Sequence, residues 1–399
     1  MATTARFRHI VLGCGAIGAA TAFWLAERSG GDVLVLEQYQ IGHELGASED
    51  HSRIIRYAYH STDYTSLGRA SYAAWHEVER RTGRRLIVPT GGLDLGIGAD
   101  GERQVASYAA ALAAVGISST ALDAAGIRAR WPQWHIDDDV VALYQADSGI
   151  LDIRRANAAH VALARQAGVT FADRTPVRRL VSLPDRVEAH TDAGTFAADS
   201  LVLAAGSWTG PLAESLGVRL PITLTQEQVT YYATANLDEF GPERFGIWIW
   251  HGPDRTYYGF PVYGEAAVKA GRDVSGTIVT QETRSWDPDP AQRDELTAFL
   301  AAHLPAALGP ELVTKTCVYD LTPDRNFILD LLPGHPRIAV FVGAGHAAKF
   351  AGLAGSILAD LARDGGTDHP IAPFAADRPA LTDPAHPTDF LFTGAAAGH

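Results

Sequence analysis

Cysteine and lysine are both scarce in this chain of 399 residues, which contains two cysteines and three lysines. Two cysteines exclude a disulfide-stapled fold, and no group of residues has the spacing of metal ligands, so no metal site is predicted. All the other residues counted as lysine or arginine are arginine. Arginine cannot replace lysine where a compact charge or a titratable amine is needed. The remaining lysines are therefore candidate functional residues, unless chance alone left them: Lys269, Lys315 and Lys349.

Positive charge is also in deficit, because the net charge is −13 at neutral pH. A protein that binds nucleic acid needs a basic surface, so no nucleic-acid partner is expected. The uncharged run at residues 10–26 is short for a membrane span and contains glycines, so no membrane partner is expected either. With 47% apolar and 20% charged residues, the sequence predicts a soluble cytoplasmic protein that is long enough for two domains.

The front of the chain contains a glycine-rich turn between an apolar strand and a helix, in the sequence HIVLGCGAIGAATAFWLAER. Gly13 permits a tight turn, Gly15 lets the backbone approach a pyrophosphate, and Gly18 lets the helix pack on the strand. Glu37 closes the next apolar strand, where an acid accepts hydrogen bonds from a ribose diol. This combination predicts a Rossmann-type site for FAD or NAD, with a plain glycine-rich turn as the alternative. Cys14 is interpreted as a small buried filler.

The rest of the sequence predicts an α/β (α+β) protein with a discontinuous cofactor domain. Helical patterns cover residues 62–82 and 103–115, another begins near Arg154, and a strand, glycine turn and helix close the chain. Residues 219–317 are rich in strands and aromatic side chains, which is typical of an inserted β-rich domain. The predicted parts are an FAD-binding domain at 1–85, 150–218 and 318–385, a substrate domain at 86–149 and 219–317, and a tail at 386–399.

Basic residues outside the glycine turn form further candidates. Arg53 and Arg56 are three residues apart in SRIIRYAYH, where an arginine can fork onto a carboxylate, although a solvated surface pair is an equal alternative. Lys269 ends the apolar strand EAAVKAG. Lys349 follows a glycine turn at the start of a helix, where a cation opposes the helix dipole, so its ammonium is expected to face a ligand.

Several motifs occur in a fixed order over the whole chain apart from its ends: GxGxxG, SRIIRYAY, YYGFP followed by the lysine of VKAG, CVYDLTPDRNFILD and GHAAKF. In this combination the chain resembles the monomeric sarcosine oxidase and N-methyltryptophan oxidase family of flavoenzymes. The resemblance implies a monomer that uses FAD to oxidise an N-methyl or related amino acid to an imine, with O2 reduced to H2O2. The alternatives are a flavin dehydrogenase with another electron acceptor, an oxidase of a larger cyclic or N-substituted amino acid, an NAD-linked dehydrogenase, and a non-catalytic flavin-binding subunit.

The resemblance also implies residue roles. Cys317 stands in the place of the cysteine that carries FAD through a thioether at the 8α carbon of the flavin. Arg56 and Lys349 match the pair that holds the substrate carboxylate, and Lys269 matches the lysine near flavin N5 where dioxygen is reduced. The implied catalytic residues are Lys269, Arg53 near the flavin ring, Arg56, Lys349, Tyr258 in the pocket wall, and His346 beside Lys349. The implied cofactor contacts are Gly13, Gly15, Gly18, Glu37, Arg53, Cys317, Gly345 and Lys349.

The chain departs from the family pattern near the expected pocket. Asp273 stands where members with sarcosine activity have a histidine, and Ser48 and Glu49 stand where they have a histidine pair. We hypothesise that the two carboxylates accept a cationic or hydroxyl-bearing part of a larger substrate, which places sarcosine itself in question.

Two further features have alternative interpretations. Trp248 and Trp250 alternate onto one face of a strand, where they either wall an aromatic-sized pocket or pack in the core. Lys315 has no role implied by the resemblance, and it is expected either to lie on the surface or to lower the pKa of the Cys317 thiol.

Overall fold

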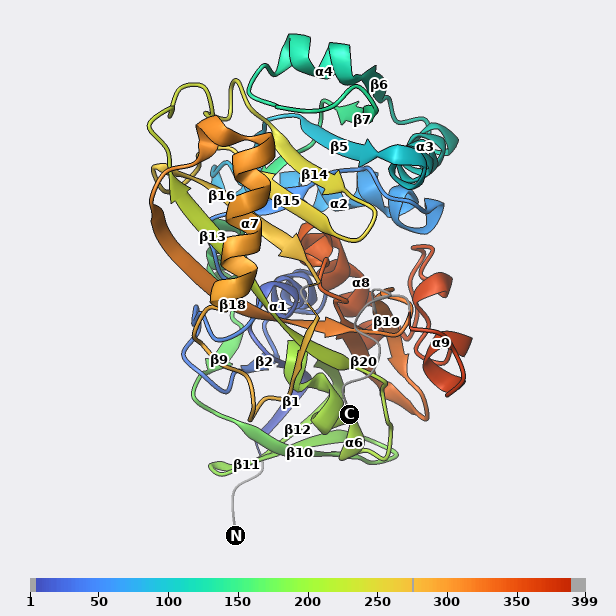
Figure 1. The fold of residues 1–399 in the computed structure, drawn as a ribbon. Helices are drawn as coiled ribbons and strands as arrows, with labels where there is room; N and C mark the ends of the chain where they lie inside the picture. Colours follow the sequence, from blue (N-terminus) through green and yellow to red (C-terminus); the bar gives the residue numbers. More distant parts are fainter. Residues whose placement is uncertain (1–4, 275, 389–399) are drawn as a thin grey trace.

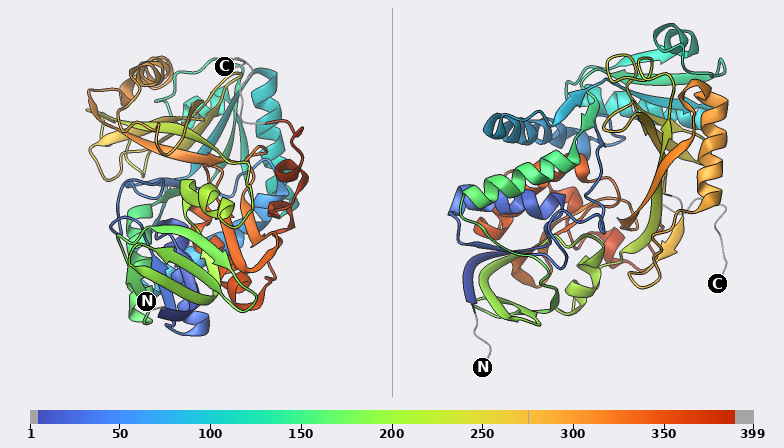
Figure 2. Two further views of the ribbon diagram at one scale, coloured as in Figure 1. Left: turned by 90° about the horizontal axis from the view of Figure 1, so that it is seen from below. Right: turned by 90° about the vertical axis from the view of Figure 1, so that its left-hand side faces the viewer.

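The computed structural model describes residues 5–274 and 276–388, which form two lobes that each surround one large β-sheet (Figure 1). The two lobes are also distinct in the views of Figure 2. One lobe carries the glycine-rich turn, and the other carries the aromatic, strand-rich segments. The chain crosses between the lobes several times, so each sheet is assembled from segments that are far apart in the sequence.

The first sheet has eight strands, and its centre is parallel. β1 (Ala5–Leu12) lies between β2 (Val33–Leu36) and β12 (Gly194–Leu203) and pairs in parallel with both. Buried valine, leucine and isoleucine fill these strands, as is usual for parallel strands that are covered on both faces. The other strands of this sheet are β9 (Thr170–Ala172), β10 (Val177–Ser182), β11 (Val187–Thr191), β19 (Ile328–Leu332) and β20 (His335–Val342).

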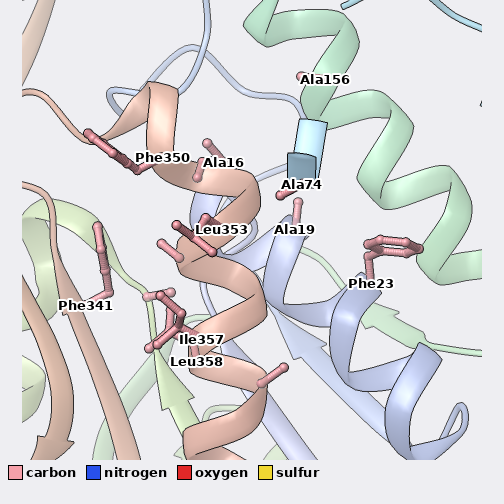
Figure 3. Packing of buried hydrophobic residues seen from close by; sticks show 14 of the residues in the cluster. Ala16, Ala19, Phe23, Ala74, Ala156, Phe341, Phe350, Leu353, Ile357 and Leu358 are labelled. Atoms are coloured by element: carbon pink, nitrogen blue, oxygen red, sulfur yellow. The ribbon is translucent and has the colours of Figure 1, made fainter. Parts of the chain in front are cut away.

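Three helices pack together on one face of this sheet: α1 (Ala16–Ser29), α5 (Ile153–Gln166) and α8 (Ala351–Asp364) (Figure 3). Small side chains line the contact between α1 and α8, where a Cβ on Gly355 would lie 2.5 Å from the Cβ of Ala20. The close packing of α1 against α8, together with the hydrophobic core around them, fixes the position of the N-terminus of α1 at the end of the glycine turn.

The second sheet has nine strands in the order β17-β13-β16-β15-β14-β5-β7-β6, with β18 (Glu311–Leu321) paired to β13 (Thr223–Ala233). Helix α7 (Pro290–His303) covers one face of this sheet over a cluster of aromatic side chains. The opposite face contributes to the cavity described below. The remaining strands are β5 (Gly92–Ile97), β6 (Thr120–Asp123), β7 (Val140–Gln145), β14 (Ile247–His251), β15 (Thr256–Phe260), β16 (Ala267–Asp273) and β17 (Thr277–Val279).

A third, small sheet has the order β3-β8-β4 and contains β3 (Arg53–Ile55), β8 (Gly149–Leu151) and β4 (Ile87–Pro89). Helix α2 (Thr62–Thr82) follows β3; Ser61 caps its first turn by accepting a backbone N–H, and Gly83 ends it in the left-handed conformation. The other helices are α3 (Gly98–Ala114), α4 (Ala124–Arg130), α6 (Thr209–Glu214) and α9 (Pro379–Thr382).

The predicted α/β class is confirmed by this arrangement of parallel and antiparallel sheets with helices. The helix predicted at 62–82 has these bounds, whereas the helix predicted at 103–115 begins earlier, at Gly98, whose φ of 59° turns the chain directly out of β5. The domain boundaries stay a prediction, and residues 389–399 of the predicted tail lie outside the described residues.

Two features are absent from the described part of the chain. No helix there is both long and apolar enough to cross a membrane. No group of three or more histidine, cysteine, aspartate or glutamate side chains there is arranged to hold a metal ion.

Candidate active site

A cavity of about 1400 Å³ lies between the lobes and is lined by strands of both large sheets. Pockets for one small ligand usually measure roughly 300–1000 Å³, so this cavity has room for a dinucleotide and a small substrate together. All three lysines of the chain line it. Most of the predicted site residues also meet here: Gly13, Gly15, Glu37, Arg53, Arg56, Tyr258, Lys269, Cys317, Gly345, His346 and Lys349.

The glycines of the turn are required by close contacts. Gly13 has a φ of 97°, and a Cβ there would lie 2.4 Å from the carbonyl oxygen of Ala204. Gly18 packs behind the cavity wall, because a Cβ on it would lie 1.9 Å from the carbonyl oxygen of Gly13. Gly15 faces the Ser48 hydroxyl, which would lie 2.7 Å from a Cβ. The N–H of Ala16 donates to the Ser48 hydroxyl at 3.0 Å, and the turn itself lines the cavity at the N-terminus of α1, a position that fits a pyrophosphate.

Glu37 directly follows β2 and is buried at the same end of the cavity. Its carboxylate accepts the backbone N–H of Cys14 at 2.8 Å and that of Tyr39 at 2.9 Å. Burial alone would raise the pKa of Glu37, but these donors and His43 hold it below its ordinary value. The carboxylate is therefore charged at neutral pH and can accept further hydrogen bonds. Burial also raises the pKa of the Cys14 thiol to about 12, which fits an inert filler.

Cys317 lies in β18 and reaches the cavity wall. Burial raises the pKa of its thiol to about 11, although the nearby Arg53 guanidinium opposes this effect. Lys315 lies two residues earlier on the same face of the strand, and its Nζ is 3.5 Å from Oδ1 of Asp50. The ammonium of Lys315 pairs with Asp50, and the cations that lower the pKa of the Cys317 thiol most are Arg53 and Lys269, so a direct effect of Lys315 on this thiol stays a prediction.

Lys269 is the centre of a cluster on the wall near Cys317. Its side chain is 3% exposed, and its Nζ lies 2.5 Å from Oδ2 of Asp50 and donates to the carbonyl of Ser52 at 2.9 Å. Arg53 approaches the same Asp50 oxygen at 3.6 Å. Burial lowers the pKa of Lys269 to about 8, while the Asp50 charge opposes the shift. One carboxylate and two cations thus meet in a space that excludes most water.

Arg56 is the centre of a second buried cluster. Its Nη1 contacts Oδ1 of Asp94, and Nε2 of His251 lies 3.1 Å from the same oxygen. The rings of Tyr59 and Tyr108 each have their centroid 5.4 Å from the guanidinium carbon. Among the described residues, Nε of Arg56 and Nδ1 of His251 are buried without a hydrogen-bond partner. Arg56 thus lines the cavity while Asp94 offsets its charge, and its Nε is buried without a partner.

Lys349 lies beside this cluster but has no carboxylate within ion-pair distance in the described part of the chain. Its Nζ donates to the Tyr59 hydroxyl at 2.8 Å and to the carbonyl of His346 at 2.9 Å. Burial lowers the pKa of Lys349 to about 7, and Arg56 adds to this effect. The pKa of His346 is held well below its ordinary value by burial and by Lys349, so this ring is neutral.

Tyr258 and Gly345 complete the wall. Burial, with a contribution from Cys317, raises the pKa of Tyr258, so its hydroxyl keeps its proton. Gly345 has a φ of 81°, and a Cβ there would lie 2.4 Å from the Tyr319 ring. The turn before Lys349 therefore accommodates only glycine at this position without rearrangement.

The two carboxylates that depart from the family pattern are already paired. The carboxylate of Asp273 accepts hydrogen bonds from Nη1 and Nη2 of Arg325, at 2.9 and 3.3 Å. Glu49 receives Nε of Arg154 at 3.0 Å. An arginine of the chain already pairs with each of them, which leaves little reason for a cationic part of the substrate to bind there, whereas a hydroxyl-bearing part stays a prediction.

Trp248 and Trp250 face away from the cavity. They pack against Trp134, with ring centroids 5.4 and 5.8 Å apart, in the aromatic cluster under α7. The pocket-wall interpretation of these tryptophans is wrong, and the core-packing interpretation is confirmed. The opposite face of the same strand directs Ile249 and His251 into the cavity.

Four residues of the site were missed in the sequence: Asp50, Tyr59, Asp94 and His251. Asp94 and His251 lie on the neighbouring parallel strands β5 and β14, and only this pairing brings both of them to Arg56. An acid inside the otherwise apolar stretch GLDLGI was the available signal for Asp94. Asp50 lies three residues before Arg53 in ASEDHSR, and this proximity to the arginine motif was the available signal.

Comparisons with known proteins agree with this geometry. The profile of the FAD dependent oxidoreductase (DAO) family matches residues 8–361. Monomeric sarcosine oxidase from Bacillus sp. (strain B-0618) is 30% identical, over 94% of this chain and 97% of that protein. N-methyl-L-tryptophan oxidase from Escherichia coli (strain K12) is 29% identical, over 94% of this chain and 99% of that protein.

A solved structure is similar over the same length. NikD, described as an unusual amino acid oxidase essential for nikkomycin biosynthesis, has a TM-score of 0.82 and 30% identity, covering 93% of this chain and 98% of its own. The match spans both lobes and therefore includes the whole cavity. The chain belongs to the FAD dependent oxidoreductase family, in the group that contains monomeric sarcosine oxidase and N-methyl-L-tryptophan oxidase.

Proposed function

We propose that this protein is an FAD-dependent oxidase of secondary amines, which converts an N-methyl or related amino acid to an imine and reduces O2 to H2O2. The observation that carries the proposal is the single cavity that joins the glycine turn, Cys317 and all three lysines. The names of the relatives support it, since sarcosine and N-methyl-L-tryptophan are both N-methyl amino acids. FAD, when bound, supplies the two-electron acceptor for this chemistry.

The residues at one end of the cavity fit FAD. The bare backbone at Gly13 and Gly15 would hold the pyrophosphate at the N-terminus of α1, and Glu37 would accept the ribose hydroxyls. We assign the covalent attachment to Cys317, whose sulfur would form a thioether with the 8α carbon of the flavin in place of a C–H bond there. The proton of that bond would be lost, and its electron pair would pass through the flavin to O2, the oxidant of the proposed reaction. Because burial raises the thiol pKa to about 11, attachment requires loss of the thiol proton, and Arg53 and Lys269 are the cations that favour the thiolate.

Arg56 and Lys349 would bind the substrate carboxylate. Their charged groups lie 5.4 and 5.2 Å from the centroid of the same Tyr59 ring, and both residues line the cavity. Arg56 lines the cavity beside Asp94, and Lys349 donates to the Tyr59 hydroxyl with no carboxylate of the described residues within ion-pair distance. A carboxylate fixed at this point orients the adjacent amine and C–H bond for oxidation.

Lys269 would serve the reaction with O2. Oxygen becomes negatively charged as it accepts an electron, and a fixed ammonium in a dry site stabilises that charge as it develops. The side chain meets both requirements, because it is buried and is held by Asp50 and Ser52.

A second candidate is the oxidation of a larger cyclic or N-substituted amino acid. The cavity continues past Arg56 to the exposed residues Gln104 and Pro253 and to Thr256. A substituent of the substrate could extend in this direction between α3 and the turn that joins β14 to β15.

Two measurements test the proposed function. Acid precipitation of the purified protein should leave the yellow flavin in the pellet, and Cys317→Ser should release it into the supernatant. Peroxide should appear with secondary amino acids such as sarcosine, N-methyltryptophan, proline or pipecolate, and a preference for the bulkier ones would select the second candidate. A colourless protein would contradict the FAD assignment, and a flavin that amines bleach in air without forming peroxide would indicate a dehydrogenase.

A further inference from the structure

The carboxylate of Asp50 is shared by several partners that could not be identified from the sequence. Its Oδ1 accepts the Tyr231 hydroxyl at 2.6 Å and lies 3.5 Å from the ammonium of Lys315. Its Oδ2 faces Lys269 at 2.5 Å and Arg53 at 3.6 Å. The carboxylate is 4% exposed, so these contacts are made away from bulk water.

The backbone at this position is costly for an aspartate. Asp50 has a φ of 152°, a conformation that glycine adopts freely and that L side chains rarely adopt. Positions of this kind persist where the side chain is needed, because the surrounding structure must offset the strain. A carboxylate is thus held in place where the backbone favours glycine.

We propose that Asp50 is the positioning residue for the oxygen half-reaction: it fixes the Lys269 ammonium at the cavity wall and keeps it charged. This inference rests on the proposed function, because that function assigns Lys269 to the reaction with O2. Asp50 lines the cavity as well, and in this role it acts through the Lys269 side chain.

The charges around Lys269 explain why an acid is needed there. The groups that face it are Asp50 and Ser52 before β3, Arg53 on β3, Cys317 on β18, and the rings of Tyr231 and Phe260. Burial and Arg53 both lower the pKa of Lys269, and Asp50 is the charge that opposes them most strongly. With Asp50 present the pKa is about 8. Without it the ammonium would lose its proton near neutral pH, and the positive charge for oxygen would be lost.

Lysine NMR tests this inference directly, because a chain with three lysines gives three side-chain signals. In holoenzyme labelled with isotopic lysine, Lys269→Met and Lys315→Met assign the signals. Asp50→Asn should lower the titration midpoint of Lys269 by about one pH unit or more, and Asp50→Glu should restore it. Glu49→Gln is the matched control, because the neighbouring carboxylate pairs with Arg154. An unchanged midpoint in Asp50→Asn would overturn the inference.

A glycine substitution separates the charge from the backbone. Asp50→Gly relieves the positive φ, so it should unfold at a temperature equal to or above that of Asp50→Asn, yet show the same lowered lysine midpoint. A glycine variant that is stable and keeps the wild-type midpoint would also refute the role of the carboxylate.

Reoxidation of the reduced holoenzyme by O2 gives the functional readout. The wild-type rate should fall as pH rises through about 8, and in Asp50→Asn the fall should occur at lower pH, leaving at pH 8 a rate that is lower by about fivefold or more. If O2 reacts as slowly with wild type as with Lys269→Met, the oxidase proposal fails, while the lysine titration still decides whether Asp50 holds the charge. If wild type reacts fast and the Asp50→Asn profile is unchanged, the inference alone fails.

Discussion

Lysine is retained in this chain where an amine that titrates near neutral pH has a use. The pKa values of Lys269 and Lys349 are lowered to about 8 and about 7, both chiefly by burial. An arginine in either place would stay charged at every physiological pH. The third lysine, Lys315, has a more exposed side chain and contributes to the same charge cluster through Asp50.

We expect the affinity of the holoenzyme for a simple carboxylate such as benzoate to fall as pH rises above about 7. Lys349 loses its proton in this range. The cation that remains for the anion is Arg56, whose charge is partly neutralised by Asp94. Lys349→Arg should remove the pH dependence, and Lys349→Met should bind benzoate weakly at every pH. Titration of the flavin absorbance with benzoate from pH 6 to 9 measures these affinities. A wild-type affinity that is constant over this range would exclude Lys349 as the anion site.

Asp94 is expected to weaken anion binding because its carboxylate neutralises part of the positive charge of Arg56. In Asp94→Asn the amide oxygen can still accept Nη1, and the rings of Tyr59 and Tyr108 still hold the guanidinium. Benzoate should therefore bind more tightly, by on the order of 1 kcal/mol or roughly fivefold. Benzamide is the matched control, because it has no charge and its affinity should not change. Weaker benzoate binding in this variant would show that Asp94 orients Arg56 rather than offsetting its charge.

The sequence predicted those site residues whose chemistry is carried by a local pattern. The glycine turn, Glu37 and Cys317 belong to contiguous motifs, so their neighbours in the sequence identify them. Asp94 and His251 form a site only through the pairing of two strands that are distant in the sequence. The two interpretations of Trp248 stayed open in the sequence for a related reason: alternation shows that two side chains share a face, but not which face meets the core.

At the scale of elements, two glycines of the turn between β1 and α1 differ in how readily their surroundings can accommodate an added methyl group. At Gly18 the contact is with backbone, so an added methyl group requires α1 to move away from β1. At Gly15 the contact is with the hydroxyl of Ser48, a short side chain that can rotate. The helix position therefore depends on Gly18, and access to the helix N-terminus depends on Gly15.

We expect Gly18→Ala to destabilise the protein and Gly15→Ala mainly to impair cofactor loading. The first should lower the free energy of unfolding by about 2 kcal/mol or more, because it strains packing at the first turn of a buried helix. The second should unfold close to the wild-type temperature and yet retain a smaller fraction of FAD. Thermal unfolding and the ratio of flavin to protein absorbance measure the two effects. Equal destabilisation by both substitutions would contradict this division.

The sequence predicted the elements of the first lobe more fully than those of the second. In the first lobe each strand and helix carries its own apolar pattern, so β1, α1 and α2 could be located without knowledge of the fold. In the second lobe the sheet order β13-β16-β15-β14-β5-β7 joins strands on both sides of a long segment that belongs to the other lobe. No local pattern specifies such pairings, because they depend on the complete chain.

At the scale of the whole molecule, the cavity couples the two lobes. Its glycine-turn end belongs to the first sheet, whereas Cys317 and Lys269 belong to the second. A ligand that contacts both ends is bound only when the lobes are folded and in place. FAD should therefore stabilise the complete chain and not one lobe alone.

This coupling predicts a difference between tethered and free FAD that can be measured by unfolding. If Cys317 carries the cofactor, wild-type protein should unfold at a temperature that is independent of added FAD, since the tether makes the local concentration constant. Cys317→Ser binds FAD only reversibly, so its unfolding temperature should rise with free FAD, with a stabilisation of about 2.7 kcal/mol at a hundredfold excess over Kd. Cys14→Ser is the control, because that thiol is buried at the glycine turn and should leave the wild-type behaviour unchanged. A wild-type protein whose unfolding temperature rises with FAD, as in Cys317→Ser, would show that the cofactor is held without a covalent bond.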